Sequence, residues 1–213
     1  CFHDEYLPTF NRPNVHLVDT QGKGVERITA NALVANGEAF EVDCIVFATG
    51  FEVGTACTHR AGYDVTGTDG RTLSGTWAEG MQSLHGMFVH GFPNLFITQP
   101  TQGANLISNV PHNLVEAGRT IASIVGHAVA TAVDEVEVSA EAEAAWVAKL
   151  EAGGRRFAAN AGDCTPGYYN NEGQDPGRRG ILNSLGYPDG PVSFFRYIDA
   201  WRSSGDFEGL EFR

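Results

Sequence analysis

The chain has 213 residues, 42% of them hydrophobic, which is enough for one large domain or about one and a half ordinary ones with a sizeable core. Lys and Arg number 14 against 26 Asp and Glu, and the formal net charge of −12 argues against a nucleic-acid or anionic-membrane partner, because both need a basic face. No apolar run approaches the roughly 20 residues that cross a bilayer, and no segment reads as a signal peptide.

The cysteines and histidines show no metal-binding or nucleophile spacing. Cys1, Cys44, Cys57 and Cys164 form no C-x-x-C pair, so we predict free thiols in a reducing cytoplasm. No H-E-x-x-H or G-x-S-x-G motif occurs, so metal-dependent and hydrolytic functions are not indicated. The start at Cys1, without Met, leads us to expect a piece of something longer.

The first forty residues predict a short strand and a small hairpin. Alternating residues over 14–18, after a proline, are typical of a strand at a domain edge. Alternation over 25–29 and an apolar run at 32–34 lead to an Asn-Gly turn at 36–37, after which a further strand is expected. Together these segments predict an antiparallel hairpin.

The run Cys44–Ala48 has a different pattern, with five residues and no polar break. Such a run predicts a strand covered on both faces, as in a parallel α/β sheet. Thr49 and Gly50 then mark its carboxyl end, where ligands collect in open α/β sheets. Asp43 at its entrance is either a turn-forming or capping carboxylate or a cofactor contact.

The middle of the chain predicts loops followed by two strands. Residues 52–86 are rich in Gly, Thr and Asp and are expected to form loops and short strands. Leu73 and Trp77 are the expected packing anchors of this stretch. The apolar segments 87–89 and 94–98 are then expected to be strands.

A polar loop at 99–105 and a helix follow. Ser108 or Asn109 can cap the helix, and Pro111 fits its first turn. Three- and four-residue steps predict a buried face that consists of Leu114, Gly118, Ile121, Val125 and Ala128. A strand, a polar loop and a capped helix place amide groups and partial positive charge where a ligand can bind. The same pattern also fits an ordinary βα unit without a ligand.

Two more helices are predicted near the carboxyl end. Ser139 is expected to cap a helix that stops at the glycines 153–154, and a second helix is expected over 192–204 with Gly205 as its stop. Between them, 164–173 is a polar aromatic loop. The side chains expected to face inward are Trp146, Leu150, Phe194, Phe195, Ile198 and Trp201.

Several of these segments together resemble the class B flavoprotein monooxygenases, and most closely their Baeyer–Villiger branch. Residues 43–51 are similar to the family's D-x-x-x-x-A-T-G-F element. The segments 70–73, 91–96, 168–173 and 176–178 follow in the family's order. The two G-x-G-x-x-G fingerprints of the family are absent, so the resemblance implies that this chain is the carboxyl-terminal portion, somewhat under half of such an enzyme.

The resemblance implies an α/β fold, the C-terminal part of a Rossmann-like flavoprotein with two dinucleotide-binding domains. Residues 1–50 would end the NADP-binding domain with the hairpin and the ATG strand. Residues 51–213 would form the C-terminal part of the FAD-binding domain, with a helical and loop extension. The sheet would be incomplete without an N-terminal portion of the same enzyme, present either in the same chain or as a second chain.

The implied activity uses FAD and NADPH. The family inserts one oxygen atom from O2 next to a ketone carbonyl, giving an ester or lactone through a flavin C4a-peroxide. The arginine that stabilises this anion is expected before Cys1, so the chain itself is assigned no catalytic residue. Arg119, Arg178 and Arg179 are interpreted as surface or phosphate-region residues.

The resemblance also implies binding residues. The amide near Val110 would meet the flavin's pyrimidine oxygen, and Tyr168 either closes over NADP or serves loop packing. Cofactor contacts are expected at Thr49, Gly50, Gln99, Pro100, Thr101, Asn109, Val110 and Tyr168. Substrate contacts are expected at Gln102, Gly103, Ala104, Asn105 and Leu106. No metal ligand is expected.

Two alternatives remain open from the sequence. One is an N-hydroxylating or sulfur-oxidising monooxygenase of the same class, and the other is a cofactor-free fragment or interaction module without enzymatic activity. The expected partners are a ketone, O2 and the N-terminal portion of the enzyme, with no nucleic acid and no membrane.

Overall fold

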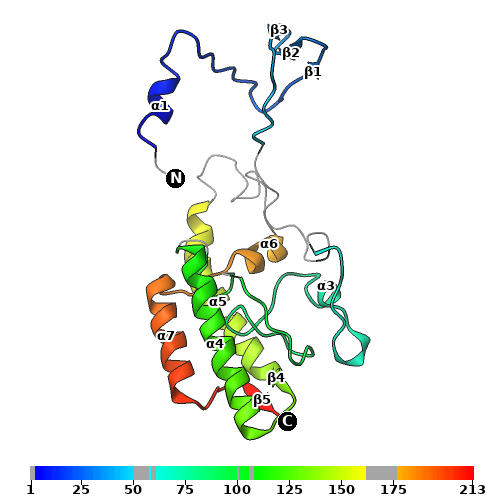
Figure 1. The fold of residues 1–213 in the computed structure, drawn as a ribbon, viewed down its shortest axis with the longest axis vertical. Helices are drawn as coiled ribbons and strands as arrows, with labels where there is room; N and C mark the ends of the chain where they lie inside the picture. The colour runs from blue at the N-terminus through cyan, green and yellow to red at the C-terminus, as the bar shows by residue number, and fades with distance from the viewer. Residues whose placement is uncertain (1–2, 50–57, 59–60, 100, 106–107, 162–176) are drawn as a thin grey trace. The chain divides into compact units, whose positions relative to one another are not determined.

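The computed structural model describes residues 3–49, 58, 61–99, 101–105, 108–161 and 177–213, with the backbone alone at 154–161 and 179. The chain divides into two compact units, Cys1–Phe51 and Glu52–Arg213. Figure 1 shows their elements, and each unit is described by itself. Helices and short strands both occur, so the fold is a mixture of the two.

The first unit contains a three-stranded antiparallel sheet. Its strands are β1 (Arg27–Ile28), β2 (Ala32–Ala35) and β3 (Glu38–Glu41), in the order β1-β2-β3. Asn36 and Gly37 connect β2 and β3 with φ values of 53° and 77°. Both are left-handed, as a two-residue hairpin turn requires. The predicted hairpin is therefore confirmed.

Two other predictions for the first unit were wrong. Residues 14–18 form no strand, and the regular element in this region is the short helix α1 (Tyr6–Thr9). Residues 44–48 also lack strand structure, and the side chains of Val46 and Phe47 are 80% and 75% exposed. A parallel strand takes its hydrogen bonds from neighbouring strands, and the described part of this unit pairs none with residues 44–48.

The second unit is built on three long helices, α4 (Val110–Thr131), α5 (Ala140–Ala161) and α7 (Gly190–Ser204). Helices α4 and α7 lie side by side in Figure 1 and contact each other. A two-stranded antiparallel sheet, β4 (Val136–Val138) and β5 (Leu210–Phe212), joins the chain after α4 to its carboxyl end. This sheet was not predicted, because each strand has only three residues.

Shorter helical elements also occur among the described residues of this unit. In the stretch expected to form loops and short strands, residues 68–70 form a 3-10 helix, η1 (Thr68–Gly70), followed by α3 (Leu73–Thr76). Leu73 is 2% exposed and belongs to a small apolar cluster on which Trp77 packs. The prediction of both residues as packing anchors is therefore confirmed. The remaining helix, α6 (Gly177–Ser184), lies before α7.

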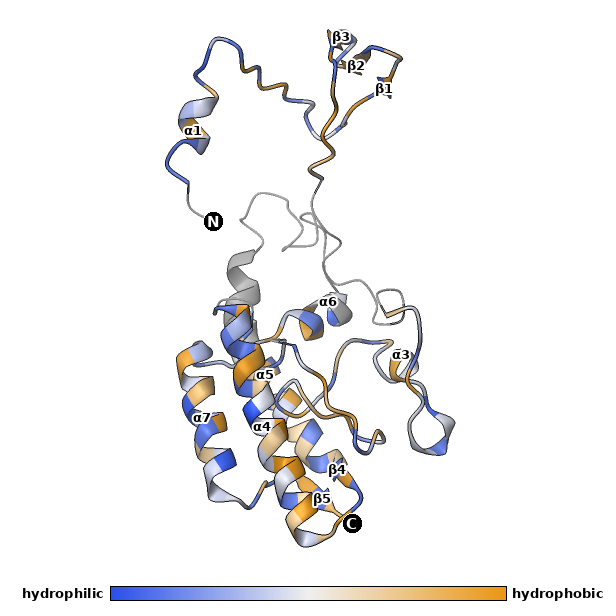
Figure 2. Ribbon diagram, in the orientation of Figure 1, coloured by the Kyte–Doolittle hydropathy of each residue, from blue (hydrophilic) through white to orange (hydrophobic). Residues whose placement is uncertain are grey.

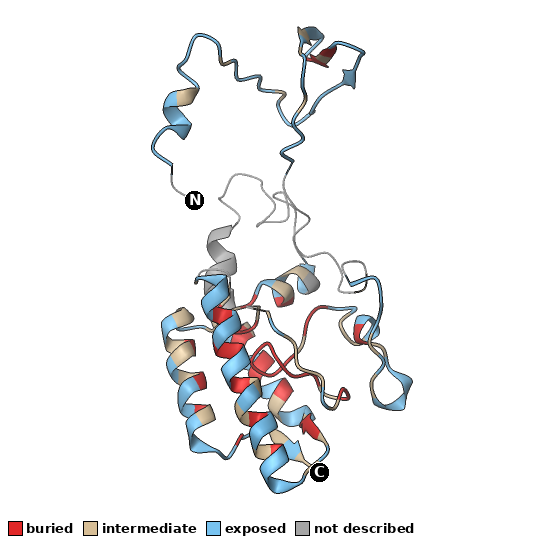
Figure 3. Ribbon diagram, in the orientation of Figure 1, coloured by how far each residue is buried: buried red, intermediate tan, exposed pale blue. Residues whose placement is uncertain are grey.

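Helix α4 begins as its sequence predicts but buries a different face. The side chain of Asn109 accepts a hydrogen bond from the N–H of His112 at 3.1 Å, and Pro111 lies in the first turn. The buried residues are Asn113, Glu116, Ala117, Thr120, Ile124 and Ala128. Leu114 and Val125, expected inside, are 42% and 43% exposed. Ala128 is buried as predicted, but the rest of the predicted face was wrong, because polar side chains share the inner stripe with Ala117 and Ile124. Figure 3 shows the buried residues of α4 in red.

Helix α5 begins as predicted and ends later. The hydroxyl of Ser139 accepts a hydrogen bond from the N–H of Ala142 at 3.2 Å, and Trp146 and Leu150 are buried. The expected stop at residues 153–154 was wrong. Gly153 lies inside α5 and faces Pro188, where a Cβ would lie 2.3 Å from the proline ring, so this glycine permits close packing and does not end the helix.

Helix α7 agrees closely with its prediction. Phe194, Ile198 and Trp201 are buried, while Phe195 packs only partly buried against the same core. Gly205 ends the helix with φ at 75°, a left-handed conformation that glycine adopts without steric cost.

The segments 87–89 and 94–98 are not strands, and this prediction was wrong. They lie in an irregular stretch in which residues 87–89 are buried and residues 94–98 are partly buried or exposed. Its backbone hydrogen bonds go to several partners. The N–H of Ile97 bonds to the carbonyl of Met87 at 2.9 Å, and the N–H of Asn94 bonds to that of Val136 at 2.9 Å. Apolar residues therefore pack this stretch against the core without forming a sheet. Figure 2 shows the hydropathy of the irregular segments.

Candidate functional site

The polar loop before α4 holds most of the predicted binding residues. Residues 101–105, Gln99, Asn109 and Val110 are described in the second unit, and Thr49 is an exposed residue of the first. Other predicted site residues lie outside the described residues, namely Gly50, Pro100, Leu106 and Tyr168. Their roles stay predictions.

Gln102 is the most deeply buried residue of this loop. Its side chain is 0% exposed. The amide nitrogen donates to the carbonyls of Met81 at 2.6 Å and Leu182 at 3.2 Å. The amide oxygen accepts from the hydroxyl of Ser83 at 2.6 Å. Because these bonds point into the core, a substrate contact by this side chain would require breaking them, and the geometry gives Gln102 a role in holding the loop.

Residues of α5 and of the segment before α7 donate hydrogen bonds to the backbone carbonyls of the loop. The indole N–H of Trp146 donates to the carbonyl of Gln102 at 3.0 Å. The N–H of Tyr187 donates to the carbonyl of Gly103 at 2.9 Å. Gly103 packs tightly, because a Cβ would lie 3.0 Å from the ring of Phe194 and the ring would have to shift. The loop is therefore ordered by contacts from parts of the chain far away in sequence.

Asn105 connects the loop to the start of α4. Its amide donates to the carbonyl of Ser184 at 2.8 Å. Its own carbonyl accepts from the amide of Asn113 at 3.2 Å, and Ser108 bonds to the side-chain oxygen of Asn113 at 2.7 Å. The loop and the first turn of α4 consequently form one hydrogen-bonded structure.

Gln99 stabilises the start of the loop. Its amide nitrogen donates to the carbonyl of Thr101 at 3.1 Å, and its oxygen accepts from the N–H of Thr101 at 3.3 Å. Gln99 is only partly buried, and so is Thr101. Both therefore remain accessible in part to a bound molecule, unlike Gln102.

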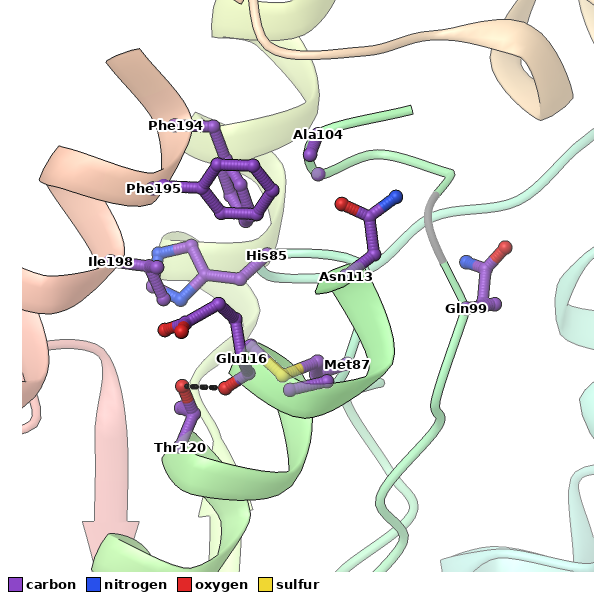
Figure 4. A pocket seen from close by; sticks show the side chains of 12 residues that line it. His85, Met87, Gln99, Ala104, Asn113, Glu116, Thr120, Phe194, Phe195 and Ile198 are labelled. Carbon is purple, nitrogen blue, oxygen red and sulfur yellow. Dashed lines mark hydrogen bonds between the residues drawn. The ribbon is translucent and has the colours of Figure 1, made fainter. Parts of the chain in front are cut away.

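A small pocket lies behind this loop, shown in Figure 4. Its volume is about 20 Å³, which is room for a single water and far below the ~300 Å³ of an ordinary ligand site. It therefore cannot hold a ketone by itself. Its lining residues are His85, Met87, Gln99, Gly103, Ala104, Asn113, Glu116, Ala117, Thr120, Phe194, Phe195 and Ile198.

A partly buried ion network borders the pocket between α4 and α7. The carboxylate of Glu116 bonds to Arg202 at 3.3 Å and to Arg119 at 2.6 Å. Arg202 also donates to the hydroxyl of Thr120 at 3.3 Å and to Asp199 at 2.5 Å. The side chains of Glu116 and Arg202 are 11% and 13% exposed. This pairing explains how a carboxylate can occupy the inner face of α4.

His85 is a buried histidine that the sequence reading did not single out. It is 2% exposed, and its Nε2 lies 3.0 Å from the hydroxyl of Tyr197. The rings of Trp146 and Trp201 meet it edge to face, at centroid distances of 4.6 and 4.9 Å. Burial, and to a smaller extent the nearby Lys149, lowers the pKa of His85 to about 3. His85 is therefore neutral at physiological pH.

A second buried carboxylate lies outside the pocket lining. Glu143 accepts a hydrogen bond from the backbone N–H of His90 at 2.7 Å. Burial raises the pKa of Glu143, although this hydrogen bond and the charges nearby oppose the rise. The carboxylate serves to hold the buried backbone of the irregular stretch.

The sequence analysis did not predict four residues that line the pocket: His85, Asn113, Glu116 and Thr120. The three residues on α4 follow one another at steps of three and four, which is a helical period, but polar residues at this period normally mark the outer face. Only their partners in α7 and the preceding loop make them interior. Arg119 and Arg178, whose side chains are both 64% exposed, agree with the prediction that they lie at the surface.

Among the described residues, neither a metal-binding cluster nor a membrane-spanning helix is found. None of its His, Cys, Asp and Glu residues form a group of three or more that could hold a metal ion. None of its helices combines the length and apolar character needed to span a bilayer.

Curated proteins match the chain along its whole length. It is 49% identical to pentalenolactone D synthase of Streptomyces arenae and 40% identical to Baeyer-Villiger monooxygenase 4 of Dietzia sp. (strain D5). In both cases 100% of this chain is covered, but only 36% and 34% of the relative. The chain therefore spans about a third of the length of these relatives. No protein-family model matches it.

Solved structures match in the same way. The polycyclic ketone monooxygenase of the fungus Thermothelomyces thermophila has a TM-score of 0.84 and 34% identity, with 99% of this chain and 34% of that one covered. A steroid monooxygenase bound to NADP has a TM-score of 0.78 and 25% identity, with 98% and 37% covered. The chain is therefore similar, over its whole length, to the C-terminal part of flavin-dependent monooxygenases, among them proteins named Baeyer-Villiger monooxygenase.

Proposed function

We propose that this chain forms part of an FAD- and NADPH-dependent Baeyer–Villiger monooxygenase, which inserts one oxygen atom of O2 next to a ketone carbonyl. The observation that carries the proposal is its similarity, over the whole chain, to enzymes of that name. Because the chain spans about a third of these relatives, the activity requires polypeptide beyond these residues. An ester or lactone is the expected product.

The proposed domain assignment follows the division of the chain. Residues 1–50 are the end of a Rossmann-like NADP-binding domain, and residues 51–213 are the C-terminal part of the FAD-binding domain. The two compact units, Cys1–Phe51 and Glu52–Arg213, support this boundary. The exposed apolar side chains of Val46 and Phe47 support the proposal that strands from an N-terminal portion complete the sheet, in the same or in a second chain.

The residues before α4 fit a flavin at the start of this helix. Asn109 satisfies one amide of the first turn, and Val110 beside it is 38% exposed. A helix start carries partial positive charge and suits the pyrimidine oxygen of a flavin, which becomes negative on reduction. Gln99, Thr101, Asn109 and Val110 would hold the ring, together with Pro100. When bound, FAD supplies the activation of O2 and NADPH the reducing hydride.

The chain's own residues would position and enclose the reacting molecules. The bond of Gln102 into the core and the bond of Asn105 to Ser184 hold the loop in one conformation, so the loop can orient a ketone without first being ordered. Gly103, Ala104 and Leu106 would shape the ketone pocket, and Thr49, Gly50 and Tyr168 would lie beside NADP. The spacing of the cysteines supports a cytoplasmic location.

The test begins with the flavin content of the purified protein and every polypeptide that accompanies it. We expect flavin absorbance after denaturation, NADPH oxidation stimulated by a cyclic ketone, and a lactone that carries one atom from labelled O2. Oxidation of an amine or a sulfide with the ketone untouched would favour an N-hydroxylating or sulfur-oxidising enzyme. A colourless sample with no companion polypeptide would favour a fragment without enzymatic activity.

A substitution at the end of the apolar run tests the nicotinamide position. Gly50→Val is expected to abolish NADPH oxidation, because the added side chain would obstruct the cofactor. Thr49→Ser serves as the matched control and should leave the rate within twofold. Survival of NADPH oxidation in the valine variant would refute this position while leaving the ketone assay to decide the reaction class.

A further inference from the structure

One ring nitrogen of His85 has no hydrogen-bond partner in the part of the chain that the structure describes. The Nε2 atom lies 3.0 Å from the hydroxyl of Tyr197, whereas Nδ1 is buried and unpaired among the described residues. The residue is 2% exposed. Buried polar atoms in proteins nearly always have a partner, and an unpaired one calls for a specific explanation.

The same histidine lines the pocket behind the loop. The pocket measures about 20 Å³ and is also lined by Glu116, Asn113 and Thr120. Figure 4 shows His85 and Glu116 turned toward it from different elements. A cavity needs roughly 10–15 Å³ of this kind of volume, and two to four polar partners, to hold a water molecule. The pocket meets both conditions, and a ketone or a nucleotide would not fit.

The carboxylate of Glu116 can accept a further hydrogen bond. One oxygen accepts from Arg119 and the other from Arg202. A carboxylate oxygen has two acceptor positions, so each keeps one beside its arginine. A water that donates to this carboxylate has its own acceptor side available for an N–H group. Hydrogen bonds that follow one another in the same donor-to-acceptor direction polarise and strengthen one another.

We propose that the pocket binds one ordered water molecule, which accepts a hydrogen bond from Nδ1–H of His85 and donates one to the carboxylate of Glu116. The hydroxyl of Tyr197 then donates to Nε2, so the imidazole is the Nδ1–H tautomer. The charged and titratable groups near this row of hydrogen bonds include Glu116, Arg119, Arg202, Lys149 and Tyr197.

The water would connect the loop region to the helices. The carbonyl of His85 lies 3.3 Å from the position that a Cβ on Gly103 would occupy, so the backbone of His85 lies next to the predicted substrate loop. Glu116 belongs to α4 and pairs with Arg202 of α7. Since His85 and α4 each already bond to α7, a single water would add a link between the segment of His85 and α4. This inference does not depend on the proposed enzymatic activity.

A crystal structure that resolves ordered waters, together with ¹⁵N NMR of the histidine rings, tests the proposal. We expect one density peak within 3.2 Å of Nδ1 and the ¹⁵N shifts of a neutral ring protonated at Nδ1. A dry pocket, a peak bonded only to other groups, or a ring protonated at Nε2 would overturn the proposal. Both measurements use the unsubstituted protein, so neither depends on a variant that folds.

Two variants sharpen the test. His85→Leu removes the donor and should abolish the density peak. Tyr197→Phe is the matched control, because it removes only the partner of Nε2 and should leave the water in place. Density that persists in His85→Leu would show that the histidine does not hold the water. Loss of the density in Tyr197→Phe alone would contradict the proposed donor-to-acceptor direction of the hydrogen bonds.

Discussion

The two units differ in how far their irregular apolar segments are exposed to solvent. Residues 44–48 of the first unit are mostly apolar and form no strand, with Phe47 75% exposed. The irregular stretch around Val89 in the second unit is also apolar and not a strand, yet Val89 is 1% exposed. An apolar segment is thus buried only where other elements of the chain surround it, since its own sequence supplies the hydrophobic tendency but not the partners.

The largest expected difference between the units lies in side-chain truncation. Ile198→Ala in the core of the second unit should lower the free energy of unfolding by about 2–5 kcal/mol, because the side chain is 1% exposed. Phe47→Ala in the first unit should change it by less than about 0.5 kcal/mol. Denaturant titration of the chain measures both. Equal losses in the two variants would break the comparison.

A second prediction asks whether side chains order the irregular parts of the second unit. Gln102→Leu leaves the carbonyls of Met81 and Leu182 without their amide donor, which should lower the free energy of unfolding by on the order of 3 kcal/mol. Gln99→Leu, at a partly buried position, is the matched control and should cost about 1 kcal/mol. If the two losses match in denaturant titration, Gln102 does not hold the loop.

Acid should weaken the second unit through His85. An unfolded histidine titrates near 6.5, whereas burial lowers the pKa of His85 to about 3. The unfolded state therefore binds more protons between these values, and the free energy of unfolding should fall by about 1.4 kcal/mol per pH unit as pH drops from 6.5 toward 3. His85→Leu should flatten this dependence, measured as the denaturant midpoint against pH.

Glu143 acts in the opposite direction and serves as the control for this experiment. Its raised pKa means that the folded state keeps the proton to higher pH than the unfolded state. Its contribution to stability is therefore present below the ordinary value of 4.5 and is lost as pH rises through the folded pKa. Glu143→Gln should steepen the fall toward acid, and a flatter curve would contradict the assignment to His85.

The smallest predicted effect concerns the start of α4. Asn109→Ala removes the acceptor for the N–H of His112 and should cost about 1 kcal/mol of unfolding free energy. Asn109→Ser keeps an acceptor at this position and should lose much less. An identical melting temperature for the alanine variant and the unsubstituted chain would show that the cap does not stabilise the helix.

Local signals in the sequence predicted local structure well. The cap at Asn109, the cap at Ser139, the stop at Gly205 and the turn at 36–37 all depend on a few neighbouring residues. Each is decided by backbone conformation or a nearby hydrogen bond, so periodicity and residue type are sufficient to find it.

Features that depend on distant partners were not predictable. The inner face of α4 is polar because Arg202 meets Glu116 across 86 positions of sequence. Gln102 points into the core because the carbonyls of Met81 and Leu182 lie there. In the candidate site, the sequence identified the loop and the helix start, but not which loop side chains face inward.

The thiol of Cys44, at the start of the apolar segment 44–48, is exposed. An alkylating reagent should therefore reach this sulfur atom when no further polypeptide is bound. Polypeptide that adds strands beside residues 44–48 would shield it and slow the modification. The alkylation rate of this single atom thus reports whether the sheet has been completed, without any need for flavin, ketone or turnover.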